Sequence, residues 1–217
     1  SQAGNPTILS AVRGLGEAWN AISADQTEYL QKVYIDDNPN SVGEKDGLAF
    51  ADDGSAYSQV HKLYHAYFKK LVDENGYYDV FILNTDGEML YSVLKETDFA
   101  TNFLTGPHKD TGLGDVVRKS LAATDATIVF QDYESYTPSI DAPAAFLGAP
   151  IIDRLGNVKG VIAFQLASDR TDSILQRRTG LGETGDAYMV GTDFLLRSNP
   201  VLGDVDGARI LVERVES

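Results

Sequence analysis

Residues 78–94 read YDVFILNTDGEMLYSVL and predict a β-hairpin, the element from which the rest of the fold can be worked out. Apolar residues dominate both halves of this stretch. Between them, the segment from Asn84 to Gly87 carries the glycine that reaches the positive φ of a tight turn. We therefore expect strands over residues 78–83 and 88–94.

Two helices are expected before the hairpin. Apolar residues recur at helical spacing between residues 5 and 36, which predicts one long helix. Its apolar stripe consists of Ile8, Val12, Leu15, Trp19 and Ile22. Pro39 ends the helix, because proline keeps the preceding residue out of helical geometry. A polar loop follows over residues 38–54, and a second helix over residues 55–74 is closed by Gly76.

The chain after the hairpin predicts three more strands. They cover residues 127–133, 143–152 and 158–167, with helices over residues 112–123 and 169–178. Short connections join these strands, so they are expected to be antiparallel neighbours. Because no β-α-β alternation occurs, we expect an α+β fold: a long N-terminal helix and a PAS-like five-stranded antiparallel sheet with helices on one face.

A weak internal sequence repeat suggests a second module. Residues 81–92 (FILNTDGEMLYS) resemble residues 188–198 (YMVGTDFLLRS) with one gap, and both predict strand, Thr-Asp turn, strand. The second copy is too short for a complete module, so it is expected to be truncated or reduced. The predicted domains are an N-terminal helix and loop (1–54), a complete PAS-like module (55–177) and a partial second module (178–217).

Composition excludes several classes of function. The chain has 217 residues, with 18 Lys and Arg against 32 Asp and Glu, a net charge of −14. Nucleic-acid binding needs a basic stripe, so it is not expected. There is no cysteine, which excludes disulfides, thiolate catalysis and cysteine zinc sites.

The short motifs give no indication of catalysis. Residues 180–185 match G-x-G-x-x-G, but a helix precedes them and a strand follows, the reverse of a dinucleotide site. His61 and His65 have metal-ligand spacing on one helix face, yet a packed tyrosine-histidine helix is the more common reason for such a pair. We expect no enzyme, no metal and no cofactor.

A group of aromatic and polar residues is the best candidate for a ligand site. It comprises Phe130, Asp132, Tyr133, Tyr136 and Phe146. An aspartate on an apolar sheet face is costly to bury without a partner, so the ammonium or hydroxyl of a ligand is one hypothesis for Asp132. The structural alternatives are that Asp132 caps a turn or pairs with Lys95 or Arg118.

Several motifs together resemble a known family. They are Tyr34-Ile35-x-x-Asn38-Pro39, Tyr57-x-x-Val60-His61-x-x-Tyr64-His65, Gly76-Tyr77-Tyr78-Asp79-Val80-Phe81, Lys95-Glu96-x-Asp98-Phe99-x-Thr101-Asn102 and Ala142-Pro143-Ala144-Ala145-Phe146. Over residues 5–198 the chain resembles the double Cache (tandem PDC, PAS-like) extracytoplasmic sensor of bacterial chemoreceptors, sensor histidine kinases and nucleotide cyclases.

The resemblance implies a small-molecule pocket between the sheet and residues 95–111. The ligand contacts expected there are Tyr91, Lys95, Asp98, Asn102, Phe130, Asp132, Tyr133, Tyr136, Phe146 and Gln165. The family's amino-acid-binding branch carries an Arg-x-Trp-Tyr element that this chain lacks, so an α-amino acid would lose its carboxylate clamp. The identity of the ligand is left open.

The resemblance also implies a cellular setting. The domain would lie in the periplasm, as part of an inner-membrane receptor whose transmembrane segments fall outside this stretch. Receptors of this type are usually dimers, with the first helix as the natural seam and as the route by which a bound ligand signals. The alternative function is a pocketless interaction module that binds a periplasmic protein.

Overall fold

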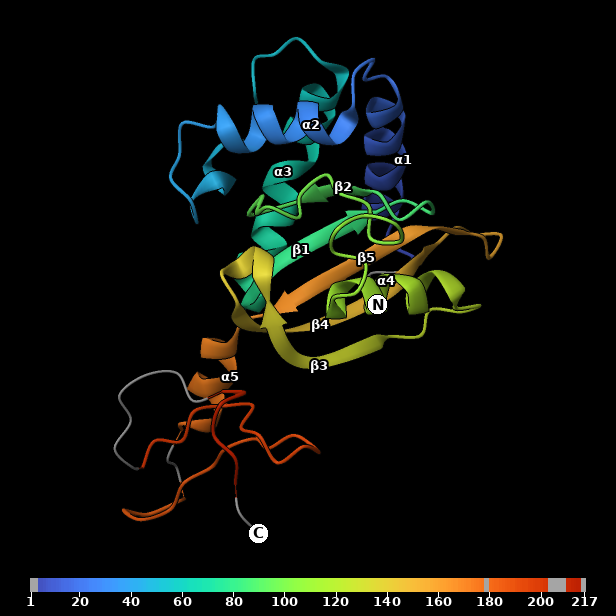
Figure 1. The fold of residues 1–217 in the computed structure, drawn as a ribbon. Helices are drawn as coiled ribbons and strands as arrows, with labels where there is room; N and C mark the ends of the chain where they lie inside the picture. The colour runs from blue at the N-terminus through green and yellow to red at the C-terminus, as the bar shows by residue number, and fades with distance from the viewer. Residues whose placement is uncertain (1–3, 178–179, 203–209, 216–217) are drawn as a thin grey trace.

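The computed structural model describes residues 4–177, 180–202 and 210–215, which form one sheet with flanking helices and a C-terminal segment (Figure 1). The helices are α1 Pro6–Asn20, α2 Gln26–Gln31, α3 Ala56–Asn75, α4 Gly112–Ala122 and α5 Ser168–Leu175. The strands are β1 Tyr77–Leu83, β2 Met89–Ser92, β3 Val129–Tyr136, β4 Ala142–Ile152 and β5 Val158–Leu166.

The five strands form one antiparallel sheet in the order β2-β1-β5-β4-β3. This confirms the predicted α+β fold and the antiparallel pairing of the last three strands. The 78–94 hairpin lies at one edge as β1 and β2. Strand β3 is the opposite edge, and its register shifts between Gln131 and Glu134.

Helices cover both faces of the sheet, so the prediction of helices on one face is wrong. Gly148 on β4 lies against α4, because a Cβ there would overlap Val116. Gly160 on β5 lies against α1, because a Cβ there would meet Val12 at 3.0 Å. Gly160 pairs with Ile151, and Ile151 is three residues from Gly148 along β4. Because successive residues of a strand point to opposite faces, Gly148 and Gly160 lie on opposite faces of the sheet, and so do α4 and α1. Both faces of these strands are apolar, and each needs a cover.

The predicted long first helix is also wrong, because it is broken at residues 21–25. The side chain of Asp25 caps α2 by accepting a hydrogen bond from the backbone N–H of Glu28 at 2.9 Å. A short π-helical turn, Lys32–Asp36, then completes the segment. The apolar periodicity hid this break, and an aspartate three residues before a glutamate was the available signal.

The stripe proposed as a dimer seam belongs to the core of the chain. Ile8, Val12, Leu15 and Trp19 are each 5% exposed or less and lie in the same hydrophobic cluster as the sheet. This core continues across the predicted boundary at residue 54. Contacts between α1 and a second copy would therefore have to use other residues.

The turn of the internal repeat is found in the described part of the C-terminal segment, but the two strands predicted around it are not, because residues 188–198 form only an isolated bridge between Val190 and Leu196 there. In the first copy, Gly87 has φ 79° and its N–H donates to the carbonyl of Asn84. In the second copy, Phe194 has φ 65° and its N–H donates to the carbonyl of Gly191. Residues 180–185 precede this turn as an irregular connection; among the residues that the structure describes, α5 comes before them and no helix follows.

Candidate functional site

Five polar side chains and one phenylalanine form a cluster between the sheet, the segment 93–111 and a short 3₁₀ turn, Thr137–Ser139. We call it the buried polar cluster. Its members are Glu96, Asp98, Tyr136, Ser139, Phe146 and Gln165. Phe146 on β4 and Gln165 on β5 are paired neighbours across the two strands. Tyr136, at the end of β3, packs edge-on against Phe146 with ring centroids 5.0 Å apart. Four residues expected as ligand contacts therefore meet here: Asp98, Tyr136, Phe146 and Gln165.

Hydrogen bonds tie the cluster together but leave two acceptors unused. The hydroxyl of Tyr136 donates to Asp98 Oδ2 at 2.5 Å. The hydroxyl of Ser139 donates to Glu96 Oε2 at 2.6 Å, and Gln165 Nε2 donates to Ser139 Oγ at 3.1 Å. Asp98 Oδ1 and Gln165 Oε1 are buried without a hydrogen-bond partner. Unpaired buried acceptors are costly, so both atoms are suited to a donor that enters the cluster.

Burial governs the charge of the cluster. It raises the pKa of Asp98 to about 7, although the hydrogen bond from Tyr136 acts in the opposite direction. It also raises the pKa of Glu96, against hydrogen bonds from Ser139 and Tyr78. A carboxyl with a pKa near neutrality changes charge easily when a cationic or donor group arrives.

Left-handed backbone flanks both segments that cover the cluster. Lys95 and Ala100 have φ of 54° and 62° and bound the residues that carry Glu96 and Asp98. On the other side, the 3₁₀ turn is followed by Ile140 and Asp141 at φ of 56° and 55°. Non-glycine residues in this conformation store strain, which concentrates at segments that switch or clamp ligands.

Ile140→Gly is expected to raise the free energy of unfolding by about 1 kcal/mol, because it removes a β-branched side chain from the left-handed region. Ile140 is 83% exposed, so little apolar burial is lost. Urea denaturation measures the change. Val42→Gly is the matched control: Val42 is 80% exposed without positive φ, and its replacement should lower stability. A loss of stability in Ile140→Gly would show that the turn is not strained.

Two of the other expected contacts lie on the opposite face, in a group of aromatic and basic side chains against α3. The hydroxyl of Tyr91 lies 2.7 Å from His65 Nδ1. Lys95 Nζ donates to the carbonyls of Ser92 and Val93 at 3.2 and 3.1 Å, and lies 5.3 Å from the centre of the Tyr91 ring. Lys95 is 1% exposed, and burial lowers its pKa to about 7. Because its Nζ is held by two backbone carbonyls on this face of the sheet, Lys95 is not placed to contact a ligand at the buried polar cluster.

The two histidines of α3 are packed into the same group. His61 and His65 stack with ring centroids 4.8 Å apart, and His61 Nδ1 lies 2.9 Å from the carbonyl of Ala49. Burial lowers the pKa of His65 to about 4. Among the described residues, no group of three or more His, Cys, Asp or Glu is placed to hold a metal ion.

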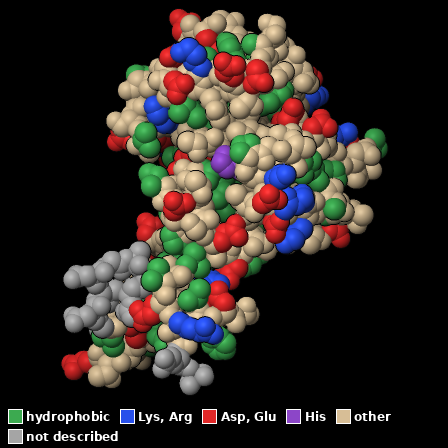
Figure 2. All heavy atoms as spheres, viewed as in Figure 1, with side chains coloured by type: hydrophobic (Ala, Val, Ile, Leu, Met, Phe, Trp, Pro, Cys, Tyr) green, Lys and Arg blue, Asp and Glu red, His purple; other side chains and the backbone are tan. Residues whose placement is uncertain are grey.

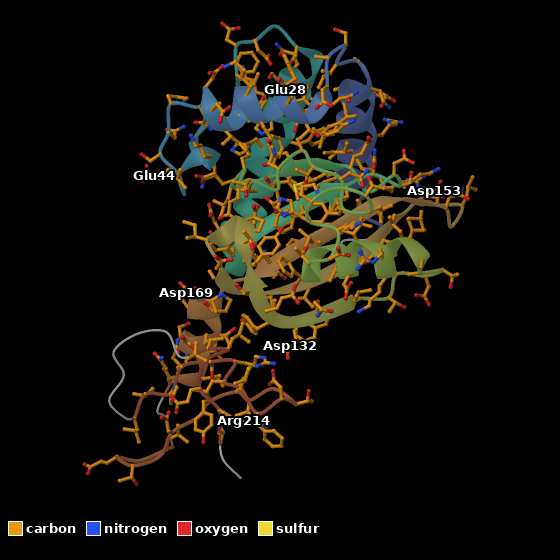
Figure 3. The ribbon with its side chains drawn as sticks, viewed as in Figure 1. Glu28, Glu44, Asp132, Asp153, Asp169 and Arg214 are labelled. Atoms are coloured by element: carbon orange, nitrogen blue, oxygen red, sulfur yellow. The ribbon has the colours of Figure 1, made fainter. Side chains whose placement is uncertain are left out.

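Asp132 is joined to the C-terminal segment rather than to the cluster. Its Oδ2 accepts from Arg197 Nε at 3.0 Å, so the alternative of a pairing with Lys95 or Arg118 is wrong. Figure 3 shows Asp132 where the sheet borders that segment. Tyr133, beside it, lies 3.1 Å through its hydroxyl from Thr171 of α5. The sequence could not reveal this pairing, because nothing in it indicates that residue 197 folds back onto β3.

The two remaining expected contacts are also outside the cluster. Phe130, on the edge strand, is 54% exposed. Asn102 holds the first hairpin by donating to the carbonyl of Asp86 at 2.9 Å. Sequence reasoning missed Glu96 and Ser139 as cluster members. Glu96 follows Lys95 in a quoted motif, and this was the signal that could have found it.

Arg197 is the main charged link between the sheet and the C-terminal segment. Its side chain is 7% exposed and also donates to Asp193 Oδ2 at 2.9 Å and to the carbonyl of Leu195 at 3.1 Å. Arg197→Gln should speed amide exchange in residues 187–199 by about fivefold, since its carboxylate partners Asp132 and Asp193 are 43% and 47% exposed and such pairs contribute about 1 kcal/mol. Exchange mass spectrometry tests this, with exposed Arg177→Gln as the control. Unchanged exchange in Arg197→Gln would mean that the segment is held by other contacts.

The chain has no helix, in the part that the structure describes, that is long and apolar enough to cross a membrane. Acidic side chains are spread over the face seen in Figure 2, in keeping with the net charge of −14.

Comparison with known proteins finds similarity only among solved structures. No protein-family model and no curated protein matches the chain. The ligand-binding domain of the Pseudomonas fluorescens chemoreceptor CtaA with L-serine has a TM-score of 0.44 at 11% identity, with 91% of this chain and 69% of that one covered. The Vibrio cholerae histidine kinase DctB sensor domain has 0.44 at 11%, covering 88% and 64%.

A third similar structure is the ligand-binding domain of the Pseudomonas aeruginosa chemoreceptor PctC with GABA. Its TM-score is 0.43 at 11% identity, and 90% of this chain and 75% of that one are covered. All three are sensor domains of the receptor classes that the sequence resemblance names. Because every TM-score is below 0.5, the likeness by itself assigns no ligand to this chain.

Proposed function

We propose that this chain is an extracytoplasmic sensor domain of the double Cache type, which binds a small molecule at the buried polar cluster and has no catalytic activity of its own. The observation that carries the proposal is the pair of unpaired acceptors, Asp98 Oδ1 and Gln165 Oε1. They come from different elements and lie in the space that the sequence resemblance assigns to the pocket. The sensing module is residues 55–177, with α1 as part of its core.

The cluster favours a ligand that donates hydrogen bonds. Its two unpaired atoms are hydrogen-bond acceptors, and one of them belongs to the Asp98 carboxyl, whose pKa is about 7. The aromatic rings of Tyr136 and Phe146 pack beside these acceptors. An ammonium group or a polyhydroxy compound fits these properties. Of the ten expected contacts, we propose direct contact for Asp98, Tyr136, Phe146 and Gln165.

Ligand entry requires movement of the covering segments, because Asp98, Tyr136, Phe146 and Gln165 are each 3% exposed or less. The strained residues Lys95, Ala100 and Ile140 lie where such a movement would turn the backbone. In the open form the covering segments have moved away from the cluster. A ligand that binds this form more tightly than the closed form shifts the equilibrium toward it, by an amount set by the difference between the two affinities.

A thermal-shift screen with amino acids, amines, polyols and organic acids tests the proposal. Ligand at about 100 times its Kd adds about 2.7 kcal/mol to stability. The shift, measured against the free form of each variant, should be lost in Asp98→Asn and kept in Asp132→Asn. Loss only in Asp132→Asn would move the site to β3. No hit would favour the protein-binding alternative, for which the exposed Ile128 (65%), just before edge strand β3, and Phe130 on that strand offer a surface.

A further inference from the structure

A cavity lies between α1 and the β4–β5 hairpin, on a part of the molecule that the buried polar cluster does not reach. Its volume is about 570 Å³, and its lining includes Leu9 and Arg13 of α1 together with Arg154 and Leu155 of the hairpin. This volume is within the range of about 300–1,000 Å³ that is usual for small-molecule sites. Figure 3 shows Asp153 of the hairpin at the edge of the molecule, well away from Asp132.

Both walls of this cavity are held by their own contacts. On the hairpin, Asp153 Oδ1 accepts from the backbone N–H groups of Leu155 and Asn157 at 2.9 Å each, and Lys159 Nζ lies 3.2 Å from Asp153 Oδ2. On the helix, Val12 is 5% exposed and anchors the lining residues of α1 in the core. The backbone of both walls is therefore held in place before a ligand binds.

The charge of the lining is positive, although the chain carries −14 overall. Three basic side chains, Arg13, Arg154 and Lys159, face one acidic side chain, Asp153. The Asp153 carboxylate is already used by Lys159 and by the hairpin backbone. Neither Arg13 nor Arg154 makes an ion pair with any residue that the structure describes. Guanidinium groups match carboxylate and phosphate oxygens in a two-pronged geometry.

The cavity also has an apolar wall. Leu9 and Val12 line it from the helix, and Leu155 lines it from the hairpin. Leu155 is 86% exposed, at the tip of an otherwise polar turn where solvation alone would favour a polar residue. We propose that this cavity is a second binding site, for an amphipathic organic anion: a carboxylate or phosphate head held by Arg13 and Arg154, with an apolar body against Leu9, Val12 and Leu155.

Isothermal titration calorimetry with octanoate and phenyl phosphate tests the site, with acetate and inorganic phosphate as head-only probes. Octanoate or phenyl phosphate should bind, and more tightly than the matching head alone. Arg13→Gln and Arg154→Gln should each weaken binding about tenfold, as expected for the loss of one charge-assisted contact. Leu155→Asn should weaken the amphipathic probes and leave the head-only probes unchanged. The exposed Arg177→Gln is the control, and Asp98→Asn should also bind normally, which separates this site from the buried polar cluster.

A vesicle arm distinguishes a free anion from a lipid headgroup. Arg13-dependent co-sedimentation with phosphatidylglycerol vesicles, without binding of the soluble probes, would identify the anion as a lipid head at the same site. The proposal is overturned if no probe and no vesicle binds at about 5 mM ligand, a concentration that detects millimolar affinity. It is also overturned if binding is equal in the wild type, Arg13→Gln and Arg154→Gln.

Discussion

Asp98→Asn is expected to stabilise the protein by about 2 kcal/mol at pH 8, a rise in Tm of about 4–8 °C for a domain of this size. The physical reason is that the folded state holds this carboxyl at a pKa of about 7, against an ordinary value of 3.8. Between these values the folded chain binds more protons than the unfolded chain, so its stability falls as the pH rises through 7. Asparagine has the shape of the protonated acid and does not titrate.

The measurement is urea denaturation of the wild type and Asp98→Asn from pH 4 to pH 8. The difference between them should be small at pH 4 and should grow toward pH 8. Asp79→Asn is the matched control, because burial also raises the pKa of that carboxyl. Asp79, however, accepts backbone N–H groups of Val80, Val93 and Leu94 at 2.6, 2.8 and 3.2 Å. An amide cannot replace all three acceptor contacts, so Asp79→Asn should destabilise. If Asp98→Asn is less stable than the wild type at every pH in this range, Asp98 Oδ1 is not an unpaired acceptor in the folded protein.

Lys95→Met is expected to stabilise the protein by about 2 kcal/mol at pH 6, because it replaces a buried ammonium by an apolar chain of similar length. The folded state lowers the pKa of Lys95 from 10.5 to about 7. The unfolded chain therefore binds more protons between pH 7 and pH 10, and the wild type gains stability as the pH rises through this window. The advantage of Lys95→Met should be largest below pH 7 and should disappear near pH 10.

Thermal unfolding at pH 6, 8 and 10 measures this dependence. Lys109 is exposed, and Lys109→Met should change stability by no more than about 0.5 kcal/mol at any of these pH values. The positive φ at residue 95 strains the backbone equally with lysine and with methionine, so this strain cancels when the stabilities of the wild type and Lys95→Met are compared. A destabilised Lys95→Met would mean that the carbonyls of Ser92 and Val93 and the Tyr34 and Tyr91 rings stabilise the ammonium by more than its burial costs.

The sheet could be predicted from the sequence because its information is local. The apolar runs within residues 78–94, the turn glycine and the short connections after residue 127 determine both the strands and their antiparallel pairing. The break at residues 21–25 was not predicted, because an apolar period continues through it. The burial of the α1 stripe against the sheet depends on contacts between distant segments, and periodicity only shows that a helix has an apolar side.

The candidate site was predicted only in part, because the sequence shows local patterns but not contacts between distant segments. Asp98, Tyr136, Phe146 and Gln165 occupy positions that motifs and strand alternation place near the pocket. Asp132 stands four residues before Tyr136 on β3, yet the register shift between Gln131 and Glu134 separates the two side chains. The partner of Asp132 is Arg197, 65 residues away in a segment whose fold the sequence shows only as a faint echo.

Strand β3 thus joins the two parts of the molecule: Tyr136 bonds to Asp98, and Asp132 bonds to Arg197. If a ligand at Asp98 displaces Tyr136 and the shift of β3 also moves Asp132, the change in free energy of the Arg197 contact contributes to the ligand's binding constant. Such thermodynamic coupling is reciprocal, so whatever fixes the C-terminal segment must alter ligand affinity by the same factor by which the ligand alters the segment. An edge strand with a register irregularity is well suited to this role, since only one neighbouring strand restrains it.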